Sequence, residues 1–314
     1  MLNILIADGM EKSSLEVLEK MNFNVVDHHY DKNDLMVEIK KYNIIVVRSA
    51  TKITKDIIDE AVKDSNLKLI IRAGVGLDNI DVDYAKENGI IVRNTPNASS
   101  SSVAELVLAH IFNMARFLHN SNISMRKGEW NKKNYQGVEI EGKVLGIIGF
   151  GRIGKVLAEK ASALGMQIKF YDPLGPGITS EDFRYCDLEE LFKTSDFISL
   201  HIPHKRCDKA IIAKDEIEKM KDGVYLINCA RGGVIDEEAL LDALDAGTIA
   251  GAAIDVFMDE PCTNRRLCTH DKVSVTPHIG GSTKEAQRKI GEEINDIILE
   301  FYKGSKANDY IETI

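Results

Sequence analysis

The sequence predicts an α/β protein with two doubly wound parallel-sheet domains. Short β-branched segments alternate with helical patterns along most of the chain, which is typical of parallel sheets covered by helices. This alternation stops once, near residues 95–97, and then resumes. A chain of 314 residues, of which 44% are hydrophobic, can bury a core in each of two domains.

The first ninety residues contain five strand candidates. Each is a short run rich in Ile, Leu or Val that is followed by residues at helical spacing. They cover residues 4–7, 25–27, 44–47, 69–71 and 90–92. We expect them to form one parallel sheet.

A long helix is predicted where the alternation stops. Residues 101–126 carry apolar side chains at helical spacing, and the serines at 99–102 favour a helix cap at its start. We interpret this helix as the crossing into the second domain.

The second alternating series contains six strand candidates, followed by a last long helix at about residues 283–302. We expect this helix to pack back on the first domain. The strand candidates are residues 144–148, 168–171, 197–200, 224–228, 252–255 and 273–275.

Composition excludes several classes of protein. A net charge of −9 opposes binding to nucleic acid and to anionic membranes. Apolar runs fall far short of the roughly 20 residues that span a bilayer, and the N-terminus lacks a signal-peptide pattern. Five scattered cysteines without a CxxC pair suit reduced thiols rather than a metal site. We therefore expect a cytoplasmic protein that binds no metal.

A glycine-rich turn predicts a dinucleotide site. Gly149, Gly151 and Gly154 follow the strand at 144–148 and begin a helical segment, with Arg152 and Ile153 between the last two glycines. The three glycines permit a tight turn, close approach of the pyrophosphate, and close packing of helix on strand. The alternative is a turn that uses glycine for packing alone.

An acidic residue follows at the expected distance. Asp172 ends the next strand, where its carboxylate can accept hydrogen bonds from ribose hydroxyls. A 2′-phosphate would meet this negative charge, so we predict NAD rather than NADP.

Three polar residues follow late strand candidates. They are Arg231, Glu260 and His278, and the carboxyl ends of parallel strands border the ligand crevice. His278 suits a base for a hydroxyl proton, Glu260 can orient it, and Arg231 can hold a carboxylate. Each residue taken alone also has a purely structural interpretation.

The motifs around these residues resemble those of the D-isomer-specific 2-hydroxyacid dehydrogenase family. They are Asn-Cys-Ala-Arg-Gly-Gly at 228–233, Ala-Ile-Asp-Val-Phe at 253–257, Asp-Glu-Pro at 259–261 and Pro-His-Ile-Gly-Gly at 277–281. The resemblance implies that Arg231, Glu260 and His278 are the catalytic residues. It adds Ala230, Asp255 and Gly280 to the cofactor-binding set.

The same resemblance implies a domain arrangement. A central Rossmann NAD-binding domain, residues 98–283, is inserted in a discontinuous flavodoxin-like substrate domain, residues 1–97 and 284–314. The family also pairs subunits through the helix near 101–126, so we expect a homodimer.

Within the family, residues 47–52, 72–79 and 281–287 resemble the branch that oxidises D-3-phosphoglycerate with NAD to 3-phosphohydroxypyruvate, the first step of L-serine biosynthesis. A small phosphorylated hydroxy acid needs matching cations, and Arg48 and Arg72 follow strand candidates. Backbone amides of a second glycine-rich segment, residues 73–76, can hold the substrate carboxylate. The expected substrate-binding residues are Arg48, Ser49, Arg72, Gly74, Val75, Gly76 and Lys132.

Lys132 belongs to this set because some relatives have an arginine there that reaches the phosphate in a neighbouring subunit. The alternative is a solvated basic surface. The sequence ends at Ile314, soon after the last expected helix, so we expect no C-terminal regulatory domain of the kind that longer relatives carry.

Two other functions remain open at this point. A glyoxylate or hydroxypyruvate reductase shares the same chemistry without the phosphate. An NAD-sensing corepressor-like binding protein can use the same fold.

Overall fold

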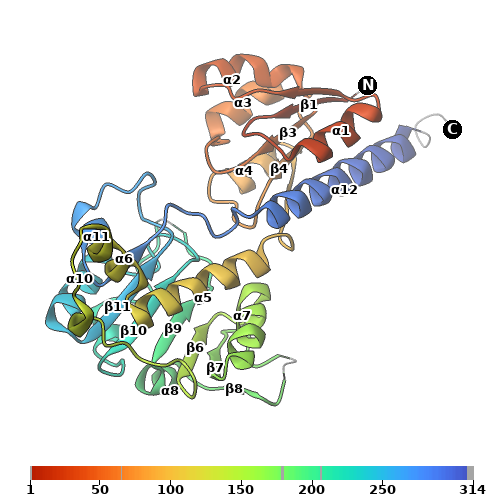
Figure 1. Cartoon of the computed structure of the whole chain (residues 1–314). Helices are drawn as coiled ribbons and strands as arrows, with labels where there is room; N and C mark the ends of the chain where they lie inside the picture. The colour runs from red at the N-terminus through yellow and green to blue at the C-terminus, as the bar shows by residue number, and fades with distance from the viewer. Residues whose placement is uncertain (1, 65, 178–179, 206, 310–314) are drawn as a thin grey trace. The chain divides into compact units, whose positions relative to one another are not determined.

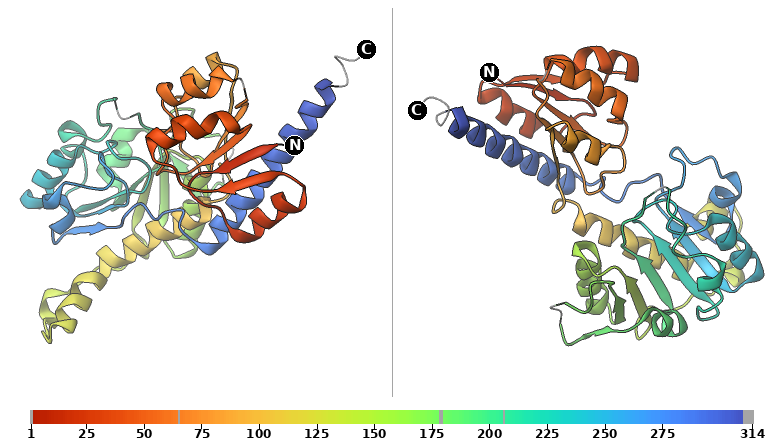
Figure 2. Two further views of the ribbon diagram at one scale, coloured as in Figure 1. Left: turned by 90° about the horizontal axis from the view of Figure 1, so that it is seen from above. Right: turned by 180° about the vertical axis from the view of Figure 1, so that it is seen from behind.

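The structure is a computed structural model that describes residues 2–64, 66–177, 180–205 and 207–309 (Figures 1 and 2). The chain divides into two compact units. Unit 1 consists of Met1–Ser99 and Gly281–Ile314, and unit 2 of Ser100–Gly280. The sequence places the two changes of domain after residues 97 and 283, whereas the compact units change after residues 99 and 280.

Unit 1 contains a five-stranded parallel sheet in the order β2-β1-β3-β4-β5. This is the flavodoxin-like order, in which the chain reverses its direction of travel at β1. The strands are β1 (Asn3–Ile6), β2 (Asn24–Asp27), β3 (Ile44–Val47), β4 (Leu69–Arg72) and β5 (Ile91–Asn94). All five expected strands are present, and their ends lie within two residues of the predicted ends.

Helices cover both faces of this sheet in Figure 1. The last helix, α12 (Lys284–Asp309), packs against α1 (Lys12–Lys20), as predicted. Its apolar residues Ile290, Ile294 and Ile298 share one core cluster with β1, β3 and β4. Gly291 lets α12 approach closely, because a Cβ there would lie 2.3 Å from Ser14 Oγ. The helices are α1 (Lys12–Lys20), α2 (Lys32–Glu38), the 3-10 turn η1 (Ile39–Lys41), α3 (Lys55–Lys63), α4 (Val82–Glu87) and α12 (Lys284–Asp309).

Unit 2 contains a seven-stranded parallel sheet in the order β12-β11-β10-β9-β6-β7-β8. This is the Rossmann order with one further strand, and the chain reverses between β6 and β9. The strands are β6 (Val144–Ile148), β7 (Gln167–Tyr171), β8 (Phe183–Tyr185), β9 (Phe197–Leu200), β10 (Val224–Asn228), β11 (Ile249–Ile254) and β12 (Val273–Val275).

The sequence prediction missed β8 and the start of β11. The edge strand β8 has three residues, none of them buried, so it lacks the apolar run that marked the other strands. The first half of β11 contains Gly251, which weakens a strand pattern. The two-domain α/β fold itself is confirmed.

The prediction of one continuous helix at residues 101–126 is wrong, because the structure has two helices there, α5 (Ser100–Arg116) and α6 (Leu118–Arg126). Phe117 has a left-handed backbone (φ 54°), which ends α5 and begins α6. Asn113 Oδ1 accepts a hydrogen bond from the His119 amide (2.8 Å), so a side chain replaces the carbonyl that an unbroken helix would supply. Three of the serines expected to cap this helix lie inside its first turn, because α5 begins at Ser100.

The α5 helix packs on α7 and crosses the sheet of unit 2 (Figure 1). Among the described residues, no helix is long and apolar enough to cross a membrane. The helices of unit 2 are α5 (Ser100–Arg116), α6 (Leu118–Arg126), the 3-10 turn η2 (Lys132–Asn134), α7 (Arg152–Ala163), α8 (Leu188–Thr194), α9 (Lys214–Ile217), α10 (Glu237–Ala246) and α11 (Arg265–Thr269).

Candidate active site

The glycine-rich turn lies between β6 and α7, next to the reversal of strand order. Gly149 has a positive φ of 94°, and a Cβ there would lie 2.4 Å from the His201 carbonyl oxygen. A Cβ on Gly154 would lie 2.4 Å from the Gly149 carbonyl oxygen. Both positions therefore require glycine for the fold of the turn itself.

Gly151 differs from the other two glycines because a Cβ there would meet nothing within 4 Å. It is the residue immediately before α7, so the open space faces the amino end of that helix. A helix amino end with room for close approach suits a pyrophosphate. Arg152 and Ile153 form the first turn of α7 beside this space.

Asp172 follows β7 and holds the glycine turn in place. Its two carboxylate oxygens accept hydrogen bonds from the Phe150 amide (2.8 Å) and the Leu174 amide (2.9 Å). Each carboxylate oxygen can accept more than one hydrogen bond, so Asp172 can still accept from a ribose hydroxyl. The sequence prediction did not foresee its role within the turn.

The loop after β10 carries Ala230 and Arg231. Asn228 shapes this loop, because its side chain accepts from the Ala230 amide (3.0 Å) and donates to the Arg231 carbonyl (2.8 Å). Gly232 packs so tightly that a Cβ would lie 1.8 Å from the Phe257 carbonyl oxygen. The loops that follow the neighbouring strands β10 and β11 are therefore in direct contact.

His278 and Glu260 are in direct contact. His278 Nδ1 lies 2.7 Å from Glu260 Oε2, and the other oxygen of Glu260 accepts from the Phe257 amide (3.1 Å). A carboxylate accepts only, so Nδ1 carries the hydrogen and Nε2 is the atom able to take a proton. Both side chains are partly open to solvent, with 40% and 35% exposed.

The electrostatics favour an ionised Glu260. Burial acts to raise its pKa, but the hydrogen bond and charge of His278, the Phe257 amide and the charge of Arg231 together bring the pKa below its ordinary value. The positive charge of Arg231 thus favours the ionised form of Glu260. The three predicted catalytic residues converge at the carboxyl ends of the strands of unit 2.

Asp255 organises the loop that carries His278. Its side chain accepts from the amides of Ile279 (2.9 Å) and Gly280 (2.9 Å), and its carbonyl accepts from the His278 amide (2.8 Å). His278 itself has a positive φ of 52°, which is unusual for a residue with a side chain. These three hydrogen bonds hold that backbone conformation.

The substrate residues expected in unit 1 lie at the carboxyl ends of two adjacent strands. Val47 and Arg72 are paired between β3 and β4, so Arg48 lies next to Arg72 at the same edge. The Arg72 guanidinium donates to the Ala73 carbonyl (3.0 Å), and a Cβ on Gly74 would lie 1.5 Å from this guanidinium. Gly74 (φ 146°) is therefore required for Arg72 to adopt its position.

Sequence reasoning missed Asp8, which anchors the loop at Arg48 and Ser49. Its carboxylate accepts from the amides of Arg48 (2.6 Å) and Thr51 (3.1 Å) and from the Thr51 hydroxyl. Asn79 fastens the same loop by donating to the carbonyls of Arg48 and Thr51, both at 2.6 Å. A polar residue directly after the first strand candidate was the available signal for Asp8.

The remaining expected residues have simpler surroundings. Val75 is exposed, and its carbonyl accepts from Asn94 (2.6 Å); Gly76 is half-buried beside it. Lys132 is exposed at the start of η2. His201, directly after β9, was also missed: it is half-buried, with Nε2 2.9 Å from Ser199 Oγ and Nδ1 shielded from solvent, and this desolvation lowers its pKa to about 4.

A doubly wound sheet with a glycine turn at its reversal, and a histidine–carboxylate pair at the neighbouring strand ends, defines a dinucleotide-dependent dehydrogenase. The comparisons with known proteins show to which family of dehydrogenases the chain belongs. The sequence profile of the D-isomer specific 2-hydroxyacid dehydrogenase, NAD binding domain, matches residues 108–280, more than half of the chain.

Named relatives agree with this match. A hydroxypyruvate reductase of Thermotoga maritima is 48% identical over 296 residues, which cover 93% of this chain and 95% of the relative. A D-3-phosphoglycerate dehydrogenase of Methanocaldococcus jannaschii is 43% identical over 314 residues, 99% of this chain but 59% of the relative. The structure of an NAD-dependent formate dehydrogenase from Staphylococcus aureus, in complex with NAD, superposes with a TM-score of 0.85 at 27% identity, covering 96% of each chain.

The chain belongs to the D-isomer-specific 2-hydroxyacid dehydrogenase family, and it is an NAD-dependent enzyme of that family. This membership favours the enzyme over the corepressor-like alternative.

Proposed function

We propose that the enzyme oxidises D-3-phosphoglycerate to 3-phosphohydroxypyruvate. The observation that carries the proposal is the pair of arginines, Arg48 and Arg72, at the ends of the adjacent strands β3 and β4. Phosphate and carboxylate groups together bring more negative charge than an unphosphorylated acid, and arginine forks match both groups. The anchored loops of Ser49 and of Gly74, Val75 and Gly76 add backbone amides for the same ligand.

The residues of unit 2 supply the cofactor site and the chemistry. Gly149, Gly151, Gly154 and Asp172, with Arg152 and Ile153, hold NAD, and Ala230, Asp255 and Gly280 border its reactive end. NAD held there would supply the acceptor for the hydride that leaves C2 of the substrate. His278 Nε2 takes the hydroxyl proton as the carbonyl forms, Glu260 stabilises the resulting imidazolium, and Arg231 holds the substrate carboxylate. Oxidation in this direction would be the first step of L-serine biosynthesis.

Steady-state kinetics test the substrate. NADH formation is followed with 3-phosphoglycerate and NAD, and NADH oxidation with phosphohydroxypyruvate, hydroxypyruvate and glyoxylate. A kcat/KM at least about tenfold higher for phosphohydroxypyruvate than for hydroxypyruvate is expected, because two charge-assisted contacts are lost without the phosphate. In the Arg48→Gln variant this preference should largely disappear. A preference for the unphosphorylated acid would overturn the proposal.

The second candidate is a hydroxypyruvate or glyoxylate reductase. The relative from Thermotoga maritima favours it, since it is named a hydroxypyruvate reductase and matches nearly all of both chains. The same assay decides between them, and the proposed roles of His278, Glu260 and Arg231 are common to both.

We also propose that two copies of the chain pair through the region of α5 and α6. This segment and the turn after it expose several large apolar side chains, with Trp130 78% and Leu118 55% exposed. Such residues mark an interface when they gather on one segment. Light scattering should give twice the chain mass, and Leu118→Glu together with Trp130→Ser should reduce it to one chain mass. In such a dimer Lys132, two residues after Trp130, is proposed to reach the substrate phosphate of the other copy.

All five cysteines are free thiols. Reduced thiols are the rule in the cytoplasm, which supports that compartment for the enzyme.

A further inference from the structure

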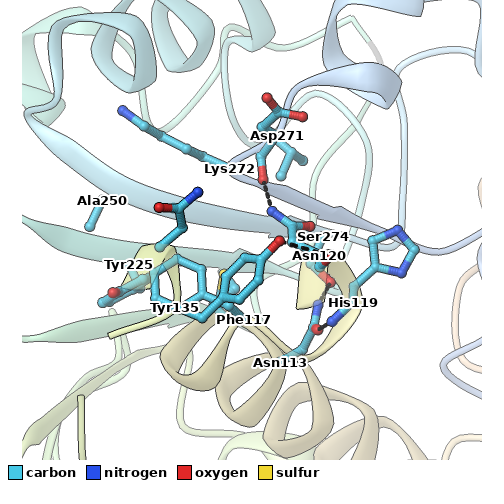
Figure 3. A pocket seen from close by; sticks show the side chains of 14 residues that line it. Asn113, Phe117, His119, Asn120, Tyr135, Tyr225, Ala250, Asp271, Lys272 and Ser274 are labelled. Atoms are coloured by element: carbon cyan, nitrogen blue, oxygen red, sulfur yellow. Dashed lines mark hydrogen bonds between the residues drawn. The ribbon is translucent and has the colours of Figure 1, made fainter. Parts of the chain in front are cut away.

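A chain of side-chain hydrogen bonds runs from the break between α5 and α6 to the loop that carries His278. It lies wholly within unit 2, and its outer end forms part of the wall of a pocket of about 240 Å³ (Figure 3). In order, its members are Asn113, Ser274, His110, Thr276 and Asp255. We call this chain the His110 relay.

The outer end fixes the direction of the first bonds. The His119 amide can only donate, so the atom of Asn113 that faces it at 2.8 Å is the oxygen. The amide nitrogen of Asn113 therefore donates to Ser274 Oγ (2.8 Å). Ser274 Oγ keeps its own hydroxyl hydrogen, which it can donate to His110 Nδ1, also at 2.8 Å.

The inner end fixes the direction independently. The Thr276 hydroxyl donates to the Asp255 carboxylate (2.6 Å), so Thr276 Oγ1 has only lone pairs left for His110. His110 Nε2 must therefore carry the hydrogen and donate to Thr276 Oγ1 (3.2 Å). The inner end thus places a hydrogen on Nε2, and in a neutral ring Nδ1 is then the acceptor that the Ser274 hydroxyl can bond.

Burial supports that state. Only 3% of His110 is exposed, and its neighbours on α5 are the buried residues Val107, Ile111 and Met114. This burial lowers the pKa of His110, against the opposing charge of Asp255. The ring is therefore neutral at pH 7, with one donor and one acceptor, and both are used.

We propose that His110 is a positioning residue for the reaction, acting through Thr276 and Asp255 on the loop of His278. Asp255 binds the amides of Ile279 and Gly280 through its side chain and the His278 amide through its carbonyl. The last hydrogen bond of the relay, from the Thr276 hydroxyl to the Asp255 carboxylate, fixes the rotamer of Asp255. His278 keeps its unusual φ of 52° because this anchor does not move.

This inference rests on the proposed catalytic role of His278. A helix position among apolar neighbours needs no histidine for packing, since an apolar residue of similar size fills the same space. Without His110, Thr276 keeps its bond to Asp255 and the Ser274 hydroxyl lines the pocket, so the loss of stability should be small. The distinguishing consequence is on turnover rather than on folding.

Two variants of the enzyme separate these roles. His110→Met fills the space and removes both hydrogen bonds, whereas His110→Gln retains one donor and one acceptor. We expect roughly a tenfold fall in kcat for His110→Met, with NADH affinity (from NADH fluorescence) and Tm changed little. His110→Gln should recover most of the lost kcat. Ser195→Ala, which removes a buried hydroxyl that donates to the Leu191 carbonyl in α8, is the matched control and should leave kcat unchanged.

A double-mutant cycle with Thr276→Val tests whether the relay acts as a unit. If it does, His110→Met should reduce kcat much less in the Thr276→Val background than in the wild type. Equal effects in both backgrounds, or a wild-type kcat in His110→Met, would overturn the inference. The proposed function fails instead if the wild-type enzyme neither oxidises 3-phosphoglycerate nor reduces any of the three 2-oxo acids. It also fails if a His278→Asn variant keeps its kcat.

Discussion

The carboxyl ends of the strands carry polar residues in both units, but the two units hold those residues differently. In unit 2 the functional side chains bond one another: Glu260 contacts His278, and Asp255 holds the loop beside it. In unit 1 the backbone is held instead, because Asp8 and Asn79 bind the amides and carbonyls around Arg48. The difference fits the proposed tasks, since proton transfer needs a fixed side-chain geometry, whereas a long arginine side chain can reach its anion from a backbone that is held.

The two units also differ in what their glycines make room for. In unit 1, Gly74 makes room for the chain's own Arg72, whereas in unit 2 Gly151 leaves space that the protein does not fill. The first glycine is required by the fold, and we propose that the second is required by the cofactor. Substitutions that exploit these differences follow, from the largest expected effect to the smallest.

His278→Asn removes the proton acceptor from unit 2. The value of kcat should fall by about a thousandfold, the usual contribution of a positioned general base. NADH fluorescence should show nearly unchanged cofactor binding. The control is His28→Asn, an exposed histidine of unit 1, which should behave as the wild type. A kcat for His278→Asn within threefold of the wild type would contradict the assigned role.

Gly151→Ala and Gly154→Ala should separate a ligand glycine from a folding glycine. The new Cβ at residue 151 meets no protein atom, so Tm should stay unchanged while the Kd of NAD rises by at least about tenfold. The new Cβ at residue 154 meets the Gly149 carbonyl, so the free energy of unfolding should fall by about 1–3 kcal/mol. Gly304→Ala in α12, where a Cβ also meets nothing, is the control. Unchanged NAD binding in Gly151→Ala would remove the pyrophosphate from this turn.

Asp8→Asn should weaken the substrate edge without affecting the cofactor edge. An amide nitrogen would face donors that now bind a carboxylate, so the loop at Arg48 loses its anchor. We expect the KM for 3-phosphoglycerate to rise by about tenfold and the Kd of NAD to stay constant. Asp27→Asn, an exposed carboxylate at the end of β2, is the control. A larger change in NAD binding than in substrate KM would reverse the roles given to the two units.

The lowered pKa of His201, in unit 2, predicts that the free energy of unfolding depends on pH. Its pKa is lowered to about 4 by burial, whereas a histidine in the unfolded chain titrates near 6.5. Below about pH 6.5 the unfolded state binds a proton that the folded state does not, so the free energy of unfolding falls as the pH falls towards 4. This group should contribute a loss of about 2 kcal/mol between pH 7 and pH 5.

Urea unfolding at pH 7 and pH 5 measures this loss. The His201→Gln variant should lose less stability on acidification than the wild type does, whereas the exposed His28→Gln variant should follow the wild type. Parallel curves for all three proteins would show that His201 is not the group responsible.

Much of the site was predictable because strand ends converge. Arg231, Glu260 and His278 each follow a buried strand candidate, and a parallel sheet brings such positions to one edge. The residues that were missed have a different character. His110 and Thr276 act through contacts 166 residues apart in sequence, and no periodicity marks such a pair.

The break at Phe117 shows the same limit. Apolar spacing continues across residue 117, so the sequence predicted one helix, but the side chain of Asn113 competes successfully for the His119 amide. Local hydrogen bonding of this kind depends on where a side chain points, which the apolar pattern does not encode.

By itself the sequence determined the alternation of strands and helices, the glycine turn, the acidic residue after β7 and the three polar residues at late strand ends. These features are local or periodic, so they can be recognised without knowing which segments touch. Only the tertiary structure decided that Asp172 holds the glycine turn, that Asp8 anchors Arg48, and that His110 joins the broken helix to Asp255. The physical reason is that a hydrogen bond depends on distance and direction in space, and the order of residues along the chain specifies neither.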